Sequence, residues 1–198
     1  AWDQWYTGRF NIKPFKGLSI KGDYSWNRYS ASRKVHRKEM TQTFPEGAAT
    51  WTVESPNYVQ NKNSNDIYQA LNVWAEYQKS FKNAHNMVLM AGYNQEQKTL
   101  ASTSYKMSNL YDNELPISDL AINYLENSET KDIWKVQGAF FRLNYDYQSK
   151  YLMEVNGRYD GSSKYAKDHR WAFFPSASVG WRISEEKFFK PLTKYVDN

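Results

Sequence analysis

Acidic side chains come nearest in this sequence to a catalytic arrangement. Either Asp160 with Asp168, or Glu185 with Glu186, could supply the carboxylate pair that glycoside hydrolysis uses. Adjacent residues of a strand point to opposite faces, so Glu185 and Glu186 fit that role poorly. Nothing in the sequence brings Asp160 against Asp168. We therefore favour solvated loop acids over a catalytic pair.

Phosphate and metal chemistry find little support. Residues 158–164, RYDGSSK, lack the GxxxxGK[ST] spacing of a phosphate loop, and no helix is predicted after them. The histidines show no metal-ligand spacing; they are His36, His85 and His169. Residues 112–119 lack the Gly and Glu of an EF-hand loop, and the chain has no cysteine. We predict no enzyme, no cofactor and no metal site.

Composition points instead to a surface between two solvents. Aromatic residues make up 17% of the 198 residues, with 16 Tyr and 8 Trp, which suit a surface that is apolar on one side and wet on the other. No run approaches the roughly 18 apolar residues of a transmembrane helix, but alternation keeps the mean hydropathy of a membrane strand low. The net charge is +5. The basic cluster at 33–38 has no stacking platform beside it, so we favour a solvated loop and predict no nucleic-acid partner.

Strict alternation of apolar and polar residues predicts an all-β protein of about seven antiparallel strands. The strands are expected at 2–12, 18–29, 67–81, 85–98, 139–147, 151–160 and 175–183. Short turns near 13–17, 82–84, 148–150 and after 184 alternate with long loops at 30–65, 99–131 and 161–173. Residues 117–125 have the spacing of a short helix on the second loop.

This alternation of connections is typical of a transmembrane β-barrel with short periplasmic turns and long extracellular loops. It places an aromatic girdle near the short turns, formed by Phe10, Phe15, Tyr77, Phe81, Tyr145, Tyr147 and Tyr151. The polar face of the strands would then line the lumen. Candidates for the substrate path are Trp74, Asn72, Glu76, Arg142, Asn144 and Arg158. For any one of them we favour pairing with neighbours or with a plug.

Residues 157–189, GRYDGSSKYAKDHRWAFFPSASVGWRISEEKFF, resemble the barrel signature of SusC-like TonB-dependent transporters of the Bacteroidetes outer membrane. The resemblance is strongest in 132–190 and looser over 1–131. The motif residues, which we expect to be structural, are Asp160, Gly161, Ser162, Ser163, Arg170, Trp171, Pro175, Gly180, Trp181 and Arg182.

The resemblance implies a barrel of about 22 strands with a plugged lumen in a Gram-negative outer membrane. It also implies uptake of an oligosaccharide, or sometimes a peptide, with a SusD-like lipoprotein as cap and TonB as the energy source. Residues 1–198 are then expected to be an internal part of the barrel domain, without the plug, the TonB box and the remaining strands. The alternative is a surface β-rich glycan-binding module, in which the apolar face would be a buried core.

Overall fold

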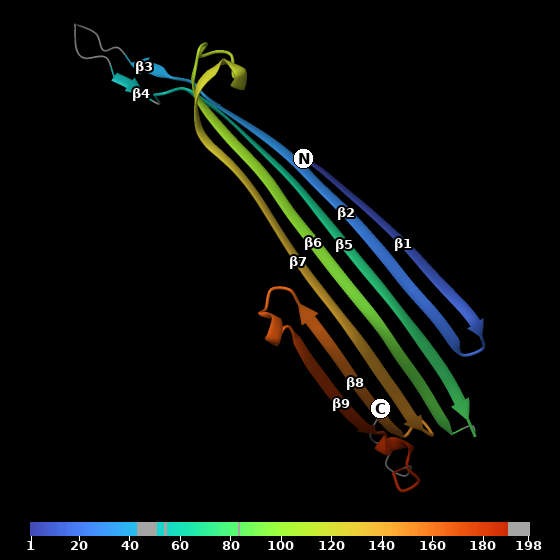
Figure 1. The fold of residues 1–198 in the computed structure, drawn as a ribbon. Helices are drawn as coiled ribbons and strands as arrows, with labels where there is room; N and C mark the ends of the chain where they lie inside the picture. Colours follow the sequence, from blue (N-terminus) through green and yellow to red (C-terminus); the bar gives the residue numbers. More distant parts are fainter. Residues whose placement is uncertain (43–50, 54, 83, 190–198) are drawn as a thin grey trace. The chain divides into compact units, whose positions relative to one another are not determined.

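The computed structural model describes residues 1–42, 51–53, 55–82 and 84–189, and strands make up most of them (Figure 1). The strands are β1 (Trp2–Phe15), β2 (Leu18–Arg37), β3 (Met40–Gln42), β4 (Trp51–Val53), β5 (Tyr58–Phe81), β6 (His85–Leu110), β7 (Ala121–Tyr147), β8 (Tyr151–Ser162) and β9 (Trp171–Trp181). The described residues also form three short 3-10 helices: η1 (Ser118–Leu120), η2 (Lys167–His169) and η3 (Ile183–Glu185). None of the helices in the described ranges is long and apolar enough to cross a membrane.

One seven-stranded sheet holds the long strands in the order β1-β2-β5-β6-β7-β8-β9, and β3 pairs separately with β4. The pairing of β7 with β8 is antiparallel and ends at Tyr147 opposite Tyr151. The pairing of β8 with β9 starts at Tyr151 opposite Trp181 and ends at Gly161 opposite Trp171. The predicted all-β class with seven antiparallel strands is confirmed.

The predicted boundaries are wrong on the long-loop side. β2 continues to Arg37 and β5 begins at Tyr58, so most of the expected loop at 30–65 is strand or the β3–β4 hairpin. The helix expected at 117–125 is also wrong, because only Ser118–Leu120 is helical and β7 starts at Ala121. Polar residues interrupt the alternation there, but cross-strand hydrogen bonds such as that between Ser102 and Thr130 continue the β6–β7 pairing. The sequence after Ser184 also predicts a helical turn that ends before Pro191; this prediction lies partly outside the described residues, and Ile183–Glu185 forms a 3-10 turn.

The chain divides into two compact units, and the first comprises residues 1–5, 27–68 and 98–133. Its small core consists of Val59, Met107 and Leu110, with Ala121 packed against it. The buried Asn57 side chain donates to the Leu110 carbonyl (3.2 Å) and accepts from the Leu110 amide (2.7 Å). The side-chain amide of Asn57 therefore satisfies the backbone groups of Leu110 where the pairing between strands ends.

The second unit comprises residues 6–26, 69–97 and 134–198, and it contains the short turns. Gly17 has φ +93°, and a Cβ there would collide with the Gln78 carbonyl oxygen, so the turn requires glycine. Gln148 and Ser149 also have left-handed φ, at 54° and 55°. The Asp146 carboxylate accepts the Ser149 amide (3.0 Å) and stabilises that turn.

Candidate functional site

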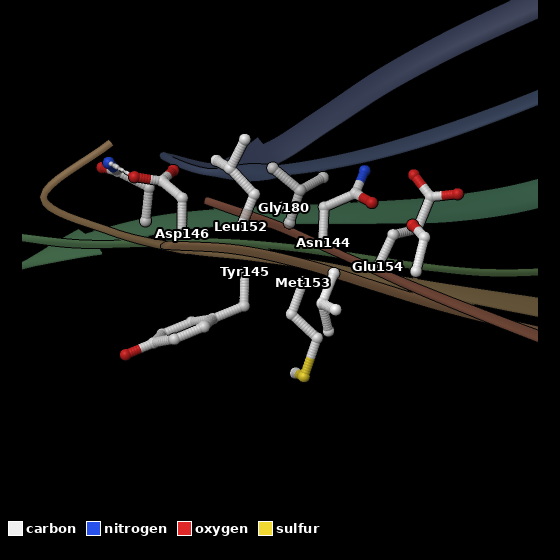
Figure 2. Close-up of a pocket in the computed structure, with 11 residues that line it drawn as sticks. Asn144, Tyr145, Asp146, Leu152, Met153, Glu154 and Gly180 are labelled. Atoms are coloured by element: carbon white, nitrogen blue, oxygen red, sulfur yellow. Dashed lines mark hydrogen bonds between the residues drawn. The ribbon is translucent and has the colours of Figure 1, made fainter. Parts of the chain in front are cut away.

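The strands of the second unit have two chemically different faces. Tyr145 and Met153 project from one side of β7 and β8, and they are paired in the strand register (Figure 2). Asn144 and Glu154, also paired, project from the other side, as does Asp146. We name these sides the apolar face and the polar face, and contacts between neighbouring strands extend them across the second unit.

The apolar face carries no charged side chain over its central band. Strand alternation and cross-strand contacts place its members on one side. They are Phe10, Ile12, Leu18, Ile20, Val73, Ala75, Leu89, Ala91, Phe141, Leu143, Val155, Ala177 and Val179. Five of them are large hydrophobic side chains that are exposed in the described chain, from Phe141 at 41% to Val179 at 86%; the others are Phe10, Ile12 and Leu89. A surface of this size has the composition of a core without a covering layer.

A row of aromatic rings borders this band along the short turns. Phe81 stacks on His85 with centroids 4.9 Å apart, and His85 lies 4.8 Å from Tyr147. Further ring contacts continue the row; its members are Phe15, Tyr77, Phe81, His85, Tyr145, Tyr147, Tyr151, Trp181 and Phe188. We name it the turn-edge aromatic row. Of the predicted girdle residues only Phe10 lies elsewhere, with its ring against Gly22.

A second aromatic row borders the band at its other side. Tyr159 stacks on Trp171 at 5.0 Å, and Tyr6 contacts Trp26 at 5.8 Å. The hydroxyl of Tyr93 donates to Gln137 in the same row (3.0 Å). Along β9, Trp171 and Trp181 are separated by about 33 Å at about 3.3 Å per residue. At the tilt of about 40° that strands have in outer-membrane barrels, this length would span about 25 Å, the height of the apolar band of such a barrel.

The polar face is a series of cross-strand pairs. Asn72 donates to Asp23 (2.9 Å), and Glu76 lies 3.6 Å from the Lys21 ammonium group. Arg142 donates through Nε to Asn156 (2.8 Å). Asn72, Glu76 and Arg142 were predicted as lumen candidates, and each has a protein partner on this face. Such pairing holds the side chains in defined positions along the wall.

Arg158 is the centre of the most connected group on the polar face. Its Nε donates to both carboxylate oxygens of Asp160 (2.8 and 2.6 Å), and Nη2 donates to Asn94 (2.9 Å). The Asp160 carboxylate lies over Gly138, in space that a Cβ would occupy. Asp160 is therefore the ion-pair partner of Arg158. Among the described residues, no contact joins Asp160 to Asp168.

Two aromatic side chains lie next to this group. A Cβ on Gly92 would come within 2.5 Å of the Phe140 ring and 2.6 Å of the Trp74 Cβ, so glycine lets Phe140 approach Trp74. The Arg158 guanidinium is 6.0 Å from the Phe140 ring centroid. We name Trp74, Asn94, Phe140, Arg158 and Asp160 the polar-face cluster. It offers flat apolar surface beside charged donors and acceptors, which suits a polar ligand with apolar faces.

The remaining lumen candidate, Asn144, lies apart from this cluster. It lines a shallow hollow with Asp146, Leu152, Glu154 and Ser178 (Figure 2). Sequence reasoning missed Phe140 and Asn94 as site residues. Their strand parity places them on the polar face, but only the pairing register brings them beside Trp74 and Arg158.

The motif residues make backbone-ordering contacts. Trp171 covers Gly161, its partner in the register, where a Cβ would lie 2.7 Å from the indole ring. Ser163 accepts the Lys135 amide through its hydroxyl (2.8 Å), and Ser162 donates its amide to the Arg170 carbonyl (3.0 Å). These contacts fasten the β8–β9 connection to β7. Further bonds are made by Arg170 to the Tyr165 carbonyl and by Arg182 to the Ser149 carbonyl.

Glu186 joins three residues at the turn edge. Its carboxylate accepts hydrogen bonds from Tyr151 (2.7 Å), Lys150 (3.4 Å) and Trp181 (3.4 Å). The hydrogen bond from Tyr151 is the main reason that the pKa of Glu186 lies below its ordinary value; desolvation opposes this, and Trp181 and Lys150 add to the lowering. Glu186 thus ties the segment after β9 to the start of β8.

A pH dependence follows from the lowered pKa of Glu186. A carboxylate with a depressed folded-state pKa stabilises the fold fully above its unfolded pKa, about 4.3. That contribution is lost as pH falls through the lower folded-state value. We expect Glu186→Gln to lower the thermal unfolding midpoint at pH 7, and the difference from the unmodified protein to shrink below about pH 4. An equal difference at pH 7 and pH 3 would contradict this role.

The described histidines and carboxylates do not gather into a metal centre. Among the described residues, no group of three or more His, Asp or Glu side chains could hold a metal ion. His85 belongs to the turn-edge aromatic row, where its Nδ1 lies 2.7 Å from the Tyr145 hydroxyl.

Comparison with known proteins matches this geometry. The family described as "TonB dependent receptor-like, beta-barrel" matches residues 2–193. TonB-dependent receptor P3 of Formosa agariphila is 32% identical over 117 residues, which are 58% of this chain and 12% of the relative. TonB-dependent receptor SusC of Bacteroides thetaiotaomicron is 47% identical over 58 residues, 29% of this chain and 6% of the relative.

Solved structures show the same fold. The structure of the RagAB peptide transporter superposes with a TM-score of 0.79 at 18% identity, covering 93% of this chain and 20% of that chain. At this identity the likeness concerns the fold alone. The match covers 12% of the length of receptor P3, 6% of that of SusC and 20% of the chain in the RagAB structure.

Proposed function

Because the chain belongs to the TonB-dependent receptor β-barrel family, a family of outer-membrane barrels, we propose that residues 1–198 form part of the barrel wall of a TonB-dependent importer. The apolar face would contact lipid and the polar face would line the lumen. One observation carries this assignment: an uncharged band lies between two aromatic rows, as on the lipid-facing surface of an outer-membrane barrel.

We propose an oligosaccharide as the substrate class. A sugar ring has an apolar face and a rim of hydroxyl groups, and the polar-face cluster offers Trp74 and Phe140 beside Arg158 and Asn94. Asn72, Glu76, Arg142 and Asn144 would continue the path along the same face. A peptide is the competing substrate, and direct uptake measurements separate the two.

The partners follow from the same proposal. A SusD-like lipoprotein would cap the outer side, and TonB would act through an N-terminal region that precedes the barrel. The alternative of a glycan-binding module needs a second layer over the apolar face. In the described residues a single seven-stranded sheet leaves that face uncovered. We therefore favour lipid as the neighbour of the apolar face.

Cell fractionation tests the membrane assignment. An antibody raised against residues 30–65 should detect an outer-membrane protein several times larger than 23.4 kDa. Protease added to intact cells should cleave it, because these residues would face outward. A soluble band at 23.4 kDa would overturn the proposal in favour of the glycan-binding module.

Trp74→Ala tests the substrate path. Loss of one aromatic contact should lower uptake of the transported oligosaccharide at low concentration by roughly two- to tenfold, at equal receptor amounts in the membrane. Trp26→Ala is the matched control, since Trp26 contacts Tyr6 on the apolar face. Uptake of labelled oligosaccharides and peptides by the deletion strain complemented with each variant gives the result. Equal uptake by the Trp74 and Trp26 variants would remove Trp74 from the path.

A further inference from the structure

We propose that the short-turn edge of the second unit binds anionic phospholipid headgroups of the adjacent membrane leaflet. This inference rests on the proposed assignment of the apolar face to lipid. Tyr and Trp rings at a membrane interface lie at headgroup level. The turn-edge aromatic row would therefore mark where lipid phosphates meet the protein.

Lysines lie beside members of this row along the chain. Lys16 comes directly after Phe15, and Lys187 directly precedes Phe188. Lys79 lies between Tyr77 and Phe81 on the apolar face of β5, and Lys82 occupies the next turn with φ 54°. We name Lys16, Lys79, Lys82 and Lys187 the turn-edge lysines. All four residues are exposed.

The turn-edge lysines are free to meet an external anion. Among the described residues none of the four is in an ion pair, whereas Lys150 is bound to Glu186. The nearby carboxylate of Asp146 is on the polar face and accepts from Asn86 (3.0 Å). Glu185 is the exposed carboxylate of this edge. Cations thus prevail at this edge.

Lipid phosphate fits this arrangement better than a soluble anion. A lysine beside an apolar surface lays its methylenes on that surface and extends its ammonium group to the interface. The apolar band ends in rings, and the turn-edge lysines are close neighbours of these aromatic residues in the chain. Each lysine near a membrane surface strengthens binding to anionic lipid by about fivefold, and salt screens this attraction.

Native mass spectrometry of the full-length receptor in detergent tests the inference. The probes are dioleoyl phosphatidylglycerol and dioleoyl phosphatidylcholine at equal concentration. The unmodified receptor should bind phosphatidylglycerol at least about fivefold more than phosphatidylcholine, and high salt should reduce the ratio. Replacing all four turn-edge lysines with glutamine should bring the ratio close to one. The matched control replaces four exposed cations of the first unit with glutamine: Arg33, Lys34, Lys62 and Lys131.

The outcomes separate this inference from the proposed function. Equal binding of both lipids by the unmodified receptor overturns it, as does a preference that survives in the turn-edge variant or disappears equally in the control. Folding of the variant is judged by its electrophoretic mobility without heating. If the variant does not fold, the lipid preference of the unmodified receptor and its salt dependence still test the inference. A receptor found in the outer membrane that binds both lipids equally overturns the headgroup site alone. A receptor absent from that membrane overturns the proposed function.

Discussion

Leu143→Arg is expected to prevent stable assembly of the receptor in the outer membrane. Leu143 lies opposite Val155 on the apolar face, between the two aromatic rows. An arginine near the bilayer midplane costs roughly 2–4 kcal/mol, which is a large share of the stability of a folded domain. Val73→Arg, on β5 of the same face, should have the same effect.

The neighbouring residue provides the control for Leu143→Arg. Asn144→Arg places the same charge on the polar face, where water or other polar groups meet it (Figure 2). We expect this receptor to reach the membrane in normal amounts. The measurement is the amount of folded receptor in isolated outer membranes, detected by its faster migration before heating. Equal assembly of both arginine variants would show that the apolar face does not contact lipid.

Gly92→Ala is expected to destabilise the barrel wall and to lower uptake together. A Cβ at this position would lie 2.5 Å from the Phe140 ring, 2.6 Å from the Trp74 Cβ and 2.8 Å from the Val73 carbonyl oxygen. The ring could turn away, but the backbone oxygen and the Trp74 Cβ are fixed by the sheet. Overpacking of this kind costs about 1–3 kcal/mol and would separate Trp74 from Phe140.

Gly8→Ala is the matched control for Gly92→Ala. No atom of the described chain lies within 4 Å of a Cβ built on Gly8, and that glycine also lies in a strand. Its replacement should leave stability unchanged or raise it slightly, because alanine loses less entropy on folding. Denaturant unfolding of the purified receptors and uptake assays report both effects. Similar stability of the two variants would show that the Gly92 contact is relieved elsewhere.

The strand pattern was predictable because alternation is a local property. The apolar and polar faces of 139–147 and 151–160 follow from a period of two, and the structure pairs these segments as β7 and β8. The order of short and long connections also follows from local signals, such as Gly17 and the turn at 148–150. The strand ends next to the long connections could not be predicted, because polar residues on both faces remove the alternation there. These ends are set by the pairing between β6 and β7, so that β6 continues to Leu110 and β7 begins at Ala121.

The candidate site divides in the same way. Alternate residues of a strand lie on opposite faces, so Trp74, Arg142 and Arg158 could be assigned to the polar face from the sequence. Which of them meet could not be read, because contacts between strands depend on register, and register is set by the whole sheet. Only the tertiary structure brings Phe140 across Gly92 towards Trp74, and Arg158 to Asn94. Alternation along the chain is enough to give the two faces and the class of fold, whereas the pairing of distant strands brings together the polar-face cluster and the aromatic rings near the turns.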